Sequence, residues 1–207
     1  MNNSQTKPLL APRLTPRKTP SQPRSAYTVE AILEGAAHIL EASGLEGYTT
    51  NAIAARAGVS IGSLYQYFPT KDAVTVALIE REMSDLVAEA IQALNIDERR
   101  EALHHLIEVA VRYQLRRPRL AMLLDFEQHR LSSMMPKSGN GATMHSALVK
   151  FLEREFPSEK ITLTVAASEL MTLISSLTDA ACRHGNNNPA QLIRRIEATV
   201  WGYLSAV

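Results

Sequence analysis

Residues 49–68, TTNAIAARAGVSIGSLYQYF, decide the fold of this chain. Two threonines precede a run of helix-forming residues that Gly58 ends, which predicts a short helix over residues 51–57. A second short helix is predicted from Ile61 to Tyr67, where Pro69 stops it. Two short helices joined by a sharp turn are typical of a helix-turn-helix.

The spacing of three residues supports this interpretation. Counted from Thr50 as position 1, Ala54 falls at position 5, Gly58 at 9 and Leu64 at 15. Helices that cross steeply need a small residue where they touch, a glycine in the turn and an aliphatic side chain in their shared core. The second helix then keeps two tyrosines and a glutamine on its exposed side, and such side chains suit contacts to phosphates and base edges.

The rest of the chain is predicted to be all-α, with about nine helices in total. Apolar residues recur at helical spacing from Val29 to Leu40, with Thr28 as the cap and Gly44 after the end. Thr70 caps a long helix predicted over residues 71–94. Further helices are predicted over residues 97–116, 118–131, 143–155, 160–184 and 189–205.

Composition excludes several classes of protein. The apolar fraction of 45% is that of a globular chain. A single cysteine, Cys182, excludes an intrachain disulfide and argues against a thiolate zinc site. No apolar run approaches the roughly 18 residues that cross a bilayer, and the N-terminus lacks the apolar stretch of a signal peptide. We expect a cytoplasmic protein without a metal or cofactor; the adjacent His104 and His105 face different sides of a helix.

Charge is distributed unevenly. Residues 1–27 contain five basic and no acidic residues, and five of the ten prolines fall in the first 23 positions. We predict a disordered basic arm over residues 1–26. Residues 28–71 carry four glutamates against Arg56 and Lys71, a net charge of −2, so DNA binding would draw on the arm for phosphate or minor-groove contacts. A merely solubilising tail or a wrongly assigned start is the alternative.

The segment GLEGYTTNAIAARAGVSIGSLYQYFPTKDAV, residues 44–74, resembles the N-terminal DNA-binding domain of TetR-family transcriptional regulators. It matches the family pattern TT…IA..AGVS.GSLY.YF..K, and the resemblance covers about 50 residues. Two features depart from the family: the arm is longer than typical, and Val74 stands where leucine is commoner. The resemblance implies a helix-turn-helix domain over residues 27–72 and a helical effector-binding and dimerisation domain over residues 73–207.

The resemblance also assigns contacts to DNA. Phosphate contacts fall to Thr50, Ser60, Tyr65, Tyr67 and Lys71. Base-edge contacts fall to Asn51, Ile61, Gly62, Ser63 and Gln66. Two alternatives remain open: Tyr67 packs on the first helix, and Thr50 only caps its own helix.

In the second domain the resemblance implies a homodimer joined by the last two helices and a small-molecule pocket between residues 71 and 184. Small residues along 160–184 and apolar residues on several sides of 189–205 agree with such an interface. Candidate pocket residues are Tyr113, Met122, Asp125, Phe126, His129, Phe151, Met171 and Thr172. Asp125 and His129, four residues apart, form either a polar clasp for a ligand or a structural hydrogen bond.

The leading interpretation is a transcriptional repressor, not an enzyme, that binds a palindromic operator as a homodimer and is released by a small molecule. One alternative is an architectural DNA-binding protein that needs no ligand. Another is a small helical enzyme that uses Asp125 and His129 as acid and base. The operator, the effector, the regulated genes, the number of dimers per operator and the direction of regulation lie outside the sequence.

Overall fold

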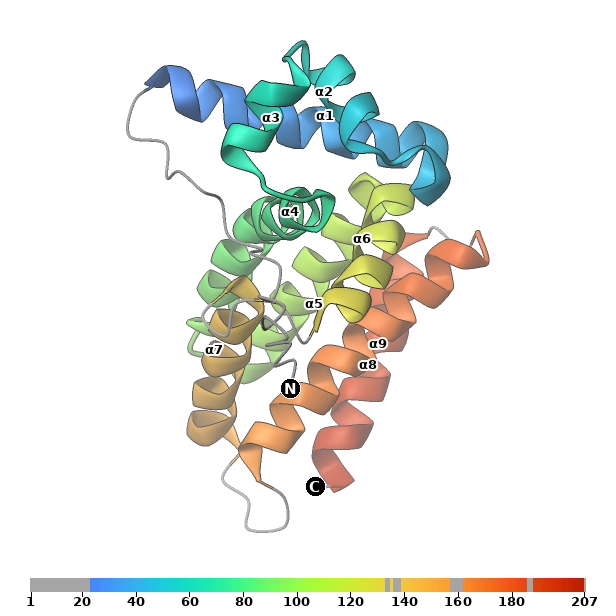
Figure 1. Ribbon diagram of the computed structural model, residues 1–207. Coiled ribbons are helices and arrows are strands. Elements are labelled where there is room, and N and C mark those ends of the chain that lie inside the picture. The colour runs from blue at the N-terminus through green and yellow to red at the C-terminus, as the bar shows by residue number, and fades with distance from the viewer. Residues whose placement is uncertain (1–22, 133–134, 136–138, 157–161, 186–187, 207) are drawn as a thin grey trace, which may run out of the picture. The chain divides into compact units, whose positions relative to one another are not determined.

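The computed structural model describes residues 23–132, 135, 139–156, 162–185 and 188–206, and all regular structure in these residues is helical (Figure 1). Nine helices follow one another: α1 (Pro23–Gly47), α2 (Thr50–Ala57), α3 (Ile61–Tyr67), α4 (Lys71–Leu94), α5 (Arg99–Arg116), α6 (Pro118–Leu131), α7 (Asn140–Glu155), α8 (Leu163–Arg183) and α9 (Pro189–Ala206). The predicted all-α fold is confirmed for these residues.

Capping residues set the ends of the short helices. Thr49 Oγ1 accepts a hydrogen bond from the Ala52 amide at 3.2 Å, and Ser60 Oγ accepts one from the Ser63 amide at 3.0 Å. Between these caps, Gly58 takes the left-handed conformation with φ of 68°. The side chain that caps α4 belongs to Thr70, which accepts from the Ala73 amide at 3.0 Å. The predicted bounds of α3 and α4 are confirmed because each end carries such a local signal.

Helix α1 departs from the prediction at its start. It begins at Pro23, five residues before the predicted cap Thr28, so residues 23–26 are helical and the prediction of disorder there is wrong. Proline is accepted in the first turn of a helix, where its missing N–H has no partner to lose. Gly44 has the predicted positive φ, 63°, but the chain continues helically beyond it to Gly47. The rest of the predicted arm, residues 1–22, lies outside the described residues.

The chain divides into two compact units, with the boundary between Leu78 and Ile79, inside α4. In the first unit α2 packs against both α1 and α3. Leu64 of α3 is completely buried, as are Ile53 of α2 and Phe68. Helix α3, the second helix of the helix-turn-helix, therefore packs into this core with one side only.

The second unit is a helical bundle. Helix α8 packs against α5, α7 and α9, while α5 also contacts α6 and α9. Helices α8 and α9 run side by side (Figure 1). Its core draws on α4, α5, α7, α8 and α9 and includes Leu103, Ile107, Phe151, Leu170 and Ile196.

Gly58 provides a test of the turn. A Cβ at this position meets no atom within 4 Å, so Gly58→Ala acts only through the left-handed backbone and should lower the free energy of unfolding by about 1–2 kcal/mol. Gly58→Asn should cost less, because asparagine tolerates this conformation better. Urea unfolding followed by circular dichroism measures both changes.

The control is Gly141→Ala in α7. Gly141 also has open space around its Cα but no positive φ, so alanine should raise stability by up to about 1 kcal/mol. Equal effects of alanine at both glycines would contradict the role given to Gly58.

Candidate functional site

Helix α3 presents an unusual surface. Ile61 and Tyr65 are 38% and 42% exposed, and Gly62 and Gln66 are exposed beside them. Large apolar and aromatic side chains on a seven-residue helix are normally used for packing, yet here they face outward. All four belong to the residues predicted to contact DNA, and of the other predicted residues on α3, Ser63 and Tyr67 are half-buried.

The side chains of α2 and α3 meet at one predicted phosphate contact. The Tyr65 hydroxyl lies 3.2 Å from Thr50 Oγ1. The residue that caps α2 is Thr49, so the alternative role for Thr50 as a cap is wrong. Because both hydroxyl groups lie at one point of the surface, a single phosphate oxygen can accept from either.

Tyr48 supports a third predicted contact and was missed from the sequence. Its ring is 1% exposed and lies 5.4 Å from the Lys71 ammonium, a cation–π contact. Its hydroxyl accepts a hydrogen bond from Thr75 Oγ1 at 3.2 Å. An aromatic residue directly before the cap of α2 was the available signal. Tyr48 therefore holds Lys71 at the start of α4, where an ammonium can meet a phosphate.

Two further predicted residues lie on the same motif. Asn51 is exposed in the first turn of α2. Ser60 is exposed, and its hydroxyl already bonds the Ser63 hydroxyl at 2.8 Å as well as the cap amide. Hydroxyl, amide and ammonium donors therefore surround the exposed side of α3, and these are the groups that bind phosphate oxygens and base edges.

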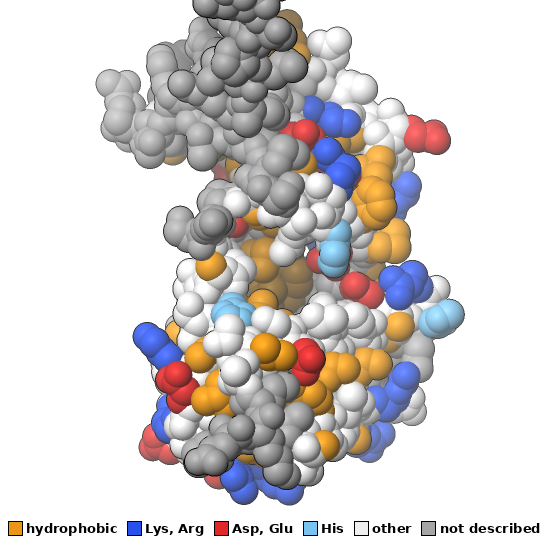
Figure 2. All heavy atoms as spheres, turned by 60° about the horizontal axis from the view of Figure 1, so that its bottom comes forward, with side chains coloured by type: hydrophobic (Ala, Val, Ile, Leu, Met, Phe, Trp, Pro, Cys, Tyr) orange, Lys and Arg blue, Asp and Glu red, His pale blue; other side chains and the backbone are white. Residues whose placement is uncertain are grey.

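The second unit encloses a cavity of about 340 Å³, lined by side chains of α4, α5, α6, α7 and α8. Most of its wall is apolar, including Ile79, Val87, Leu106 and Leu124. Figure 2 shows a hollow of this character, with a hydrophobic floor and with histidine and acidic side chains at its rim. The cavity is the candidate site of a small molecule.

Five of the eight predicted pocket residues line this cavity: Tyr113, Asp125, His129, Met171 and Thr172. The other three do not. Met122 and Phe126 are 40% and 59% exposed, because the side of α6 that carries them faces outward. Phe151 is buried in the core of the bundle, against Phe156.

A polar centre interrupts the apolar wall. The Gln114 amide donates hydrogen bonds to the Asp179 carboxylate and, at 3.5 Å, to Asp125 Oδ2. The pKa of Asp125 is raised to about 7, and burial is the largest cause. The charge and hydrogen bond of Asp179 also raise it, while the hydrogen bond from Gln114 and the charge of His129 lower it. Gln114 and Asp179 were missed from the sequence, where each is one of several polar residues on its helix.

Asp125 and His129 form a hydrogen bond, one of the two predicted alternatives, but the main chain of Asp125 makes it. His129 Nδ1 lies 2.8 Å from the main-chain oxygen of Asp125, one turn earlier in α6. The Asp125 carboxyl group instead faces Asp179 and Gln114. An imidazole at position i+4 reaches the carbonyl of its own helix easily, which leaves the carboxyl group free to point into the bundle.

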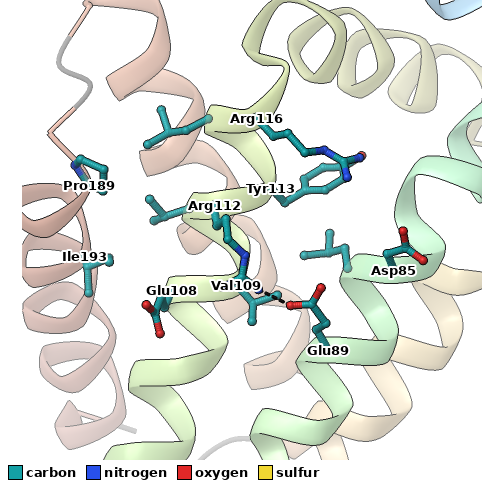
Figure 3. A pocket seen from close by; sticks show the side chains of 12 residues that line it. Asp85, Glu89, Glu108, Val109, Arg112, Tyr113, Arg116, Pro189 and Ile193 are labelled. Atoms are coloured by element: carbon teal, nitrogen blue, oxygen red, sulfur yellow. Dashed lines mark hydrogen bonds and ion pairs between the residues drawn. The ribbon is translucent and has the colours of Figure 1, made fainter.

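A second hollow, of about 530 Å³, lies between α4, α5 and the start of α9 (Figure 3). Charged side chains line it, and Arg112 reaches across to pair with Glu89. Leu86 and Tyr113 line both this groove and the cavity, so their side chains separate the two. The groove is therefore a neighbour of the cavity with a more highly charged lining.

Comparison with known proteins finds a family whose model matches the first unit. Residues 32–78 match the family model described as "Bacterial regulatory proteins, tetR family". A 67-residue stretch is 33% identical to the HTH-type transcriptional repressor DrrR1 of Streptomyces coeruleorubidus. That match spans 32% of this chain and 25% of the relative.

Solved structures share the whole fold. A transcriptional regulator of Rhodococcus sp. RHA1 superposes with a TM-score of 0.70 at 20% identity, over 86% of this chain and 96% of its own. A TetR-family regulator of Streptomyces coelicolor gives 0.67 at 23% identity, over 87% and 99%. The fatty acid degradation regulator FadR of Bacillus halodurans gives 0.63 at 16% identity, over 84% and 97%. None of the helices within the described residues is long and apolar enough to span a membrane.

The raised pKa of Asp125 predicts a dependence of stability on pH. A carboxyl group whose pKa is higher in the folded state contributes its stability fully below pH 4, and this contribution is lost as the pH rises through about 7. Asp125→Asn, which cannot ionise, should raise the Tm by about 3 °C at pH 8, or about 1 kcal/mol, and change it little at pH 5.

Thermal melting monitored by circular dichroism at both pH values measures this effect. Asp85→Asn, an exposed aspartate on α4, is the matched control and should show no such difference between the two pH values. A lower Tm for Asp125→Asn at pH 8 than for the unsubstituted protein would contradict the repulsion assigned to the acidic pair.

Proposed function

We propose that this chain, whose residues 32–78 match the family model of tetR-family bacterial regulatory proteins, is a sequence-specific repressor of transcription. It binds a palindromic operator as a homodimer and leaves it when a small molecule enters the cavity of the second unit. The proposal rests on the outward-facing side chains of α3. Ile61, Tyr65 and Gln66 are exposed there and have no role in the core.

DNA recognition divides between two groups of side chains. Thr50, Tyr65 and Lys71 bear hydroxyl or ammonium donors around α3 and bind phosphates, which position the helix in the major groove. Gln66 offers a side-chain amide that bonds adenine in two places, and Ile61 an apolar surface for a thymine methyl group. Gly62 between them lets the backbone approach the bases.

Helices α8 and α9 suit a dimer interface. Ala198, Gly202 and Ala206 are exposed at four-residue intervals along α9, and a Cβ at Gly202 would meet nothing within 4 Å of its own chain. On α8, Val165 is 45% exposed and offers an apolar surface that a second copy can cover. The small side chains of α9 allow a second copy to approach closely. Two copies related by a two-fold axis then require a palindromic site.

The effector acts through α4. This helix carries Lys71 at its start and contributes Met83, Leu86, Val87 and Ala90 to the cavity wall. A molecule that binds the cavity more tightly in one arrangement of α4 than in another shifts the population between them. The family and fold indicate a regulator rather than an enzyme, and the main-chain hydrogen bond of His129 leaves Asp125 without the imidazole partner that acid–base catalysis would need.

Selection of bound DNA from a random-sequence library, followed by sequencing, tests the function. The purified full-length protein at physiological salt should enrich one palindrome whose half-sites are about one helical turn apart. Enrichment of unrelated sequences with a steep salt dependence would replace the proposal with an architectural DNA-binding role.

Variants of the reading surface give a sharper prediction. Gln66→Ala should lower the affinity for the best sequence by about 1–3 kcal/mol and relax the preference at one base pair per half-site. Lys71→Ala should weaken binding to every sequence and reduce the salt slope by about 1 per subunit. Titrations of labelled DNA at several salt concentrations measure both.

Lys150→Ala is the control for Lys71→Ala. Lys150 is an exposed lysine of α7 in the second unit, and its removal should change neither affinity nor slope. If Gln66→Ala weakened binding to all DNA sequences equally, the Gln66 amide would contact the DNA backbone and its assignment to a base would be wrong.

A further inference from the structure

We propose that the effector is a hydrophobic amine, bound as its ammonium ion with the charge at the Asp125–Asp179 pair. This inference rests on the proposed function only in naming the bound molecule as the effector. The chemical class of the ligand is argued from the cavity and its side chains alone, and binding of the ligand can be measured without DNA.

Apart from the His129 imidazole, the titratable side chains that line the cavity are two carboxyl groups and the Tyr113 phenol. Two carboxyl groups, those of Asp125 and Asp179, line the wall, and no lysine or arginine among the described residues lines it. The arginines that come near are engaged elsewhere: Arg81 and Arg116 both bind Glu82, at 3.1 Å and 3.3 Å. An anionic ligand would therefore bring further negative charge to a half-buried acidic pair, which is unfavourable.

The acidic pair is incompletely satisfied by the protein. Both carboxyl groups share one donor, the Gln114 amide nitrogen, and a carboxylate accepts several hydrogen bonds. Without a ligand, the two groups relieve their repulsion by holding a proton between them. An ammonium group supplies up to three N–H donors and a full positive charge at the same place, so it replaces that proton with a stronger interaction.

The remainder of the wall fits the apolar part of such a molecule. Met83, Met144 and Met171 come from three different helices, and methionine side chains adapt to irregular apolar shapes. The Tyr113 ring lies in the same wall as the acidic pair and offers a face to a cation. A cavity of about 340 Å³ has room for a compact molecule.

A divalent metal ion fits the site less well. Calcium takes six to eight oxygen ligands, and magnesium keeps several waters of its own. Among the described residues only two carboxyl groups line the cavity, and the other polar groups of the wall are neutral hydroxyls, amides and one imidazole. The described residues also contain no cluster of three or more His, Cys, Asp or Glu side chains that could hold a metal ion. The wall therefore matches a molecule with one cationic end and an apolar body.

The test compares three cage compounds that share one apolar body: 1-aminoadamantane, 1-hydroxyadamantane and adamantane-1-carboxylate. Isothermal titration calorimetry with the full-length protein at pH 7.5, without DNA, measures each affinity. The amine should bind at least about tenfold more tightly than the alcohol, and the carboxylate should bind most weakly.

Substitutions then locate the charge. Asp125→Asn and Asp179→Asn each preserve shape and should weaken binding of the amine about 10- to 100-fold while changing the affinity for the alcohol less. Asp97→Asn, in the exposed loop between α4 and α5, is the matched control and should bind the amine as the unsubstituted protein does. Circular dichroism confirms that each variant is folded; if one is not, the comparison of the three compounds on the unsubstituted protein decides alone.

Three results would overturn the inference: equal binding of amine and alcohol, preference for the carboxylate, or no binding of the amine. Unchanged amine affinity in both folded aspartate variants would overturn it as well. If the DNA selection failed, the preference for the amine measured by calorimetry would still stand. Only the role of the amine as an effector of DNA binding would be given up, so the two proposals fail separately.

Discussion

The complete burial of Leu64 is the constraint on which the first unit depends. Helix α3 has only seven residues, about two turns, and it is held by Leu64 together with Phe68 just beyond its end. Fixing those two side chains in the core fixes the rotation of the helix about its axis. Ile61, Tyr65 and Gln66 must then face outward, so the surface that we propose reads DNA is a consequence of core packing.

The features that could be predicted from the sequence are those set by interactions between residues close together in the chain. The bounds of α3 and α4 were predictable because Ser60, Thr70 and the residues around them act within one turn of the chain. The inward face of α6 was predicted only in part. Met122 and Phe126 have the same helical spacing as residues that face a cavity, and only packing against other helices decides that they face outward.

The polar centre of the cavity shows the same limit more strongly. Gln114 and Asp179 are 65 positions apart and meet Asp125 only when α5, α6 and α8 have packed. No local pattern marks such a meeting, because one polar residue among several on a helix is equally compatible with an exposed position. Tyr48 was missed for the same reason: its partners, Lys71 and Thr75, lie on a helix more than twenty residues later.

Two like charges in an apolar wall lower the stability of the fold, and a bundle that only had to fold would place apolar side chains there. Their repulsion depends on the separation of α6 and α8, which carry Asp125 and Asp179. A cation between the carboxyl groups therefore has a different affinity for arrangements that differ in this separation. That difference is the thermodynamic requirement for a ligand to shift a conformational equilibrium, and a coupling of 1–3 kcal/mol is typical of allosteric proteins. The acidic pair thus has a role that a purely apolar pocket cannot fill: it makes the energy of the bundle sensitive to the charge of what the cavity holds.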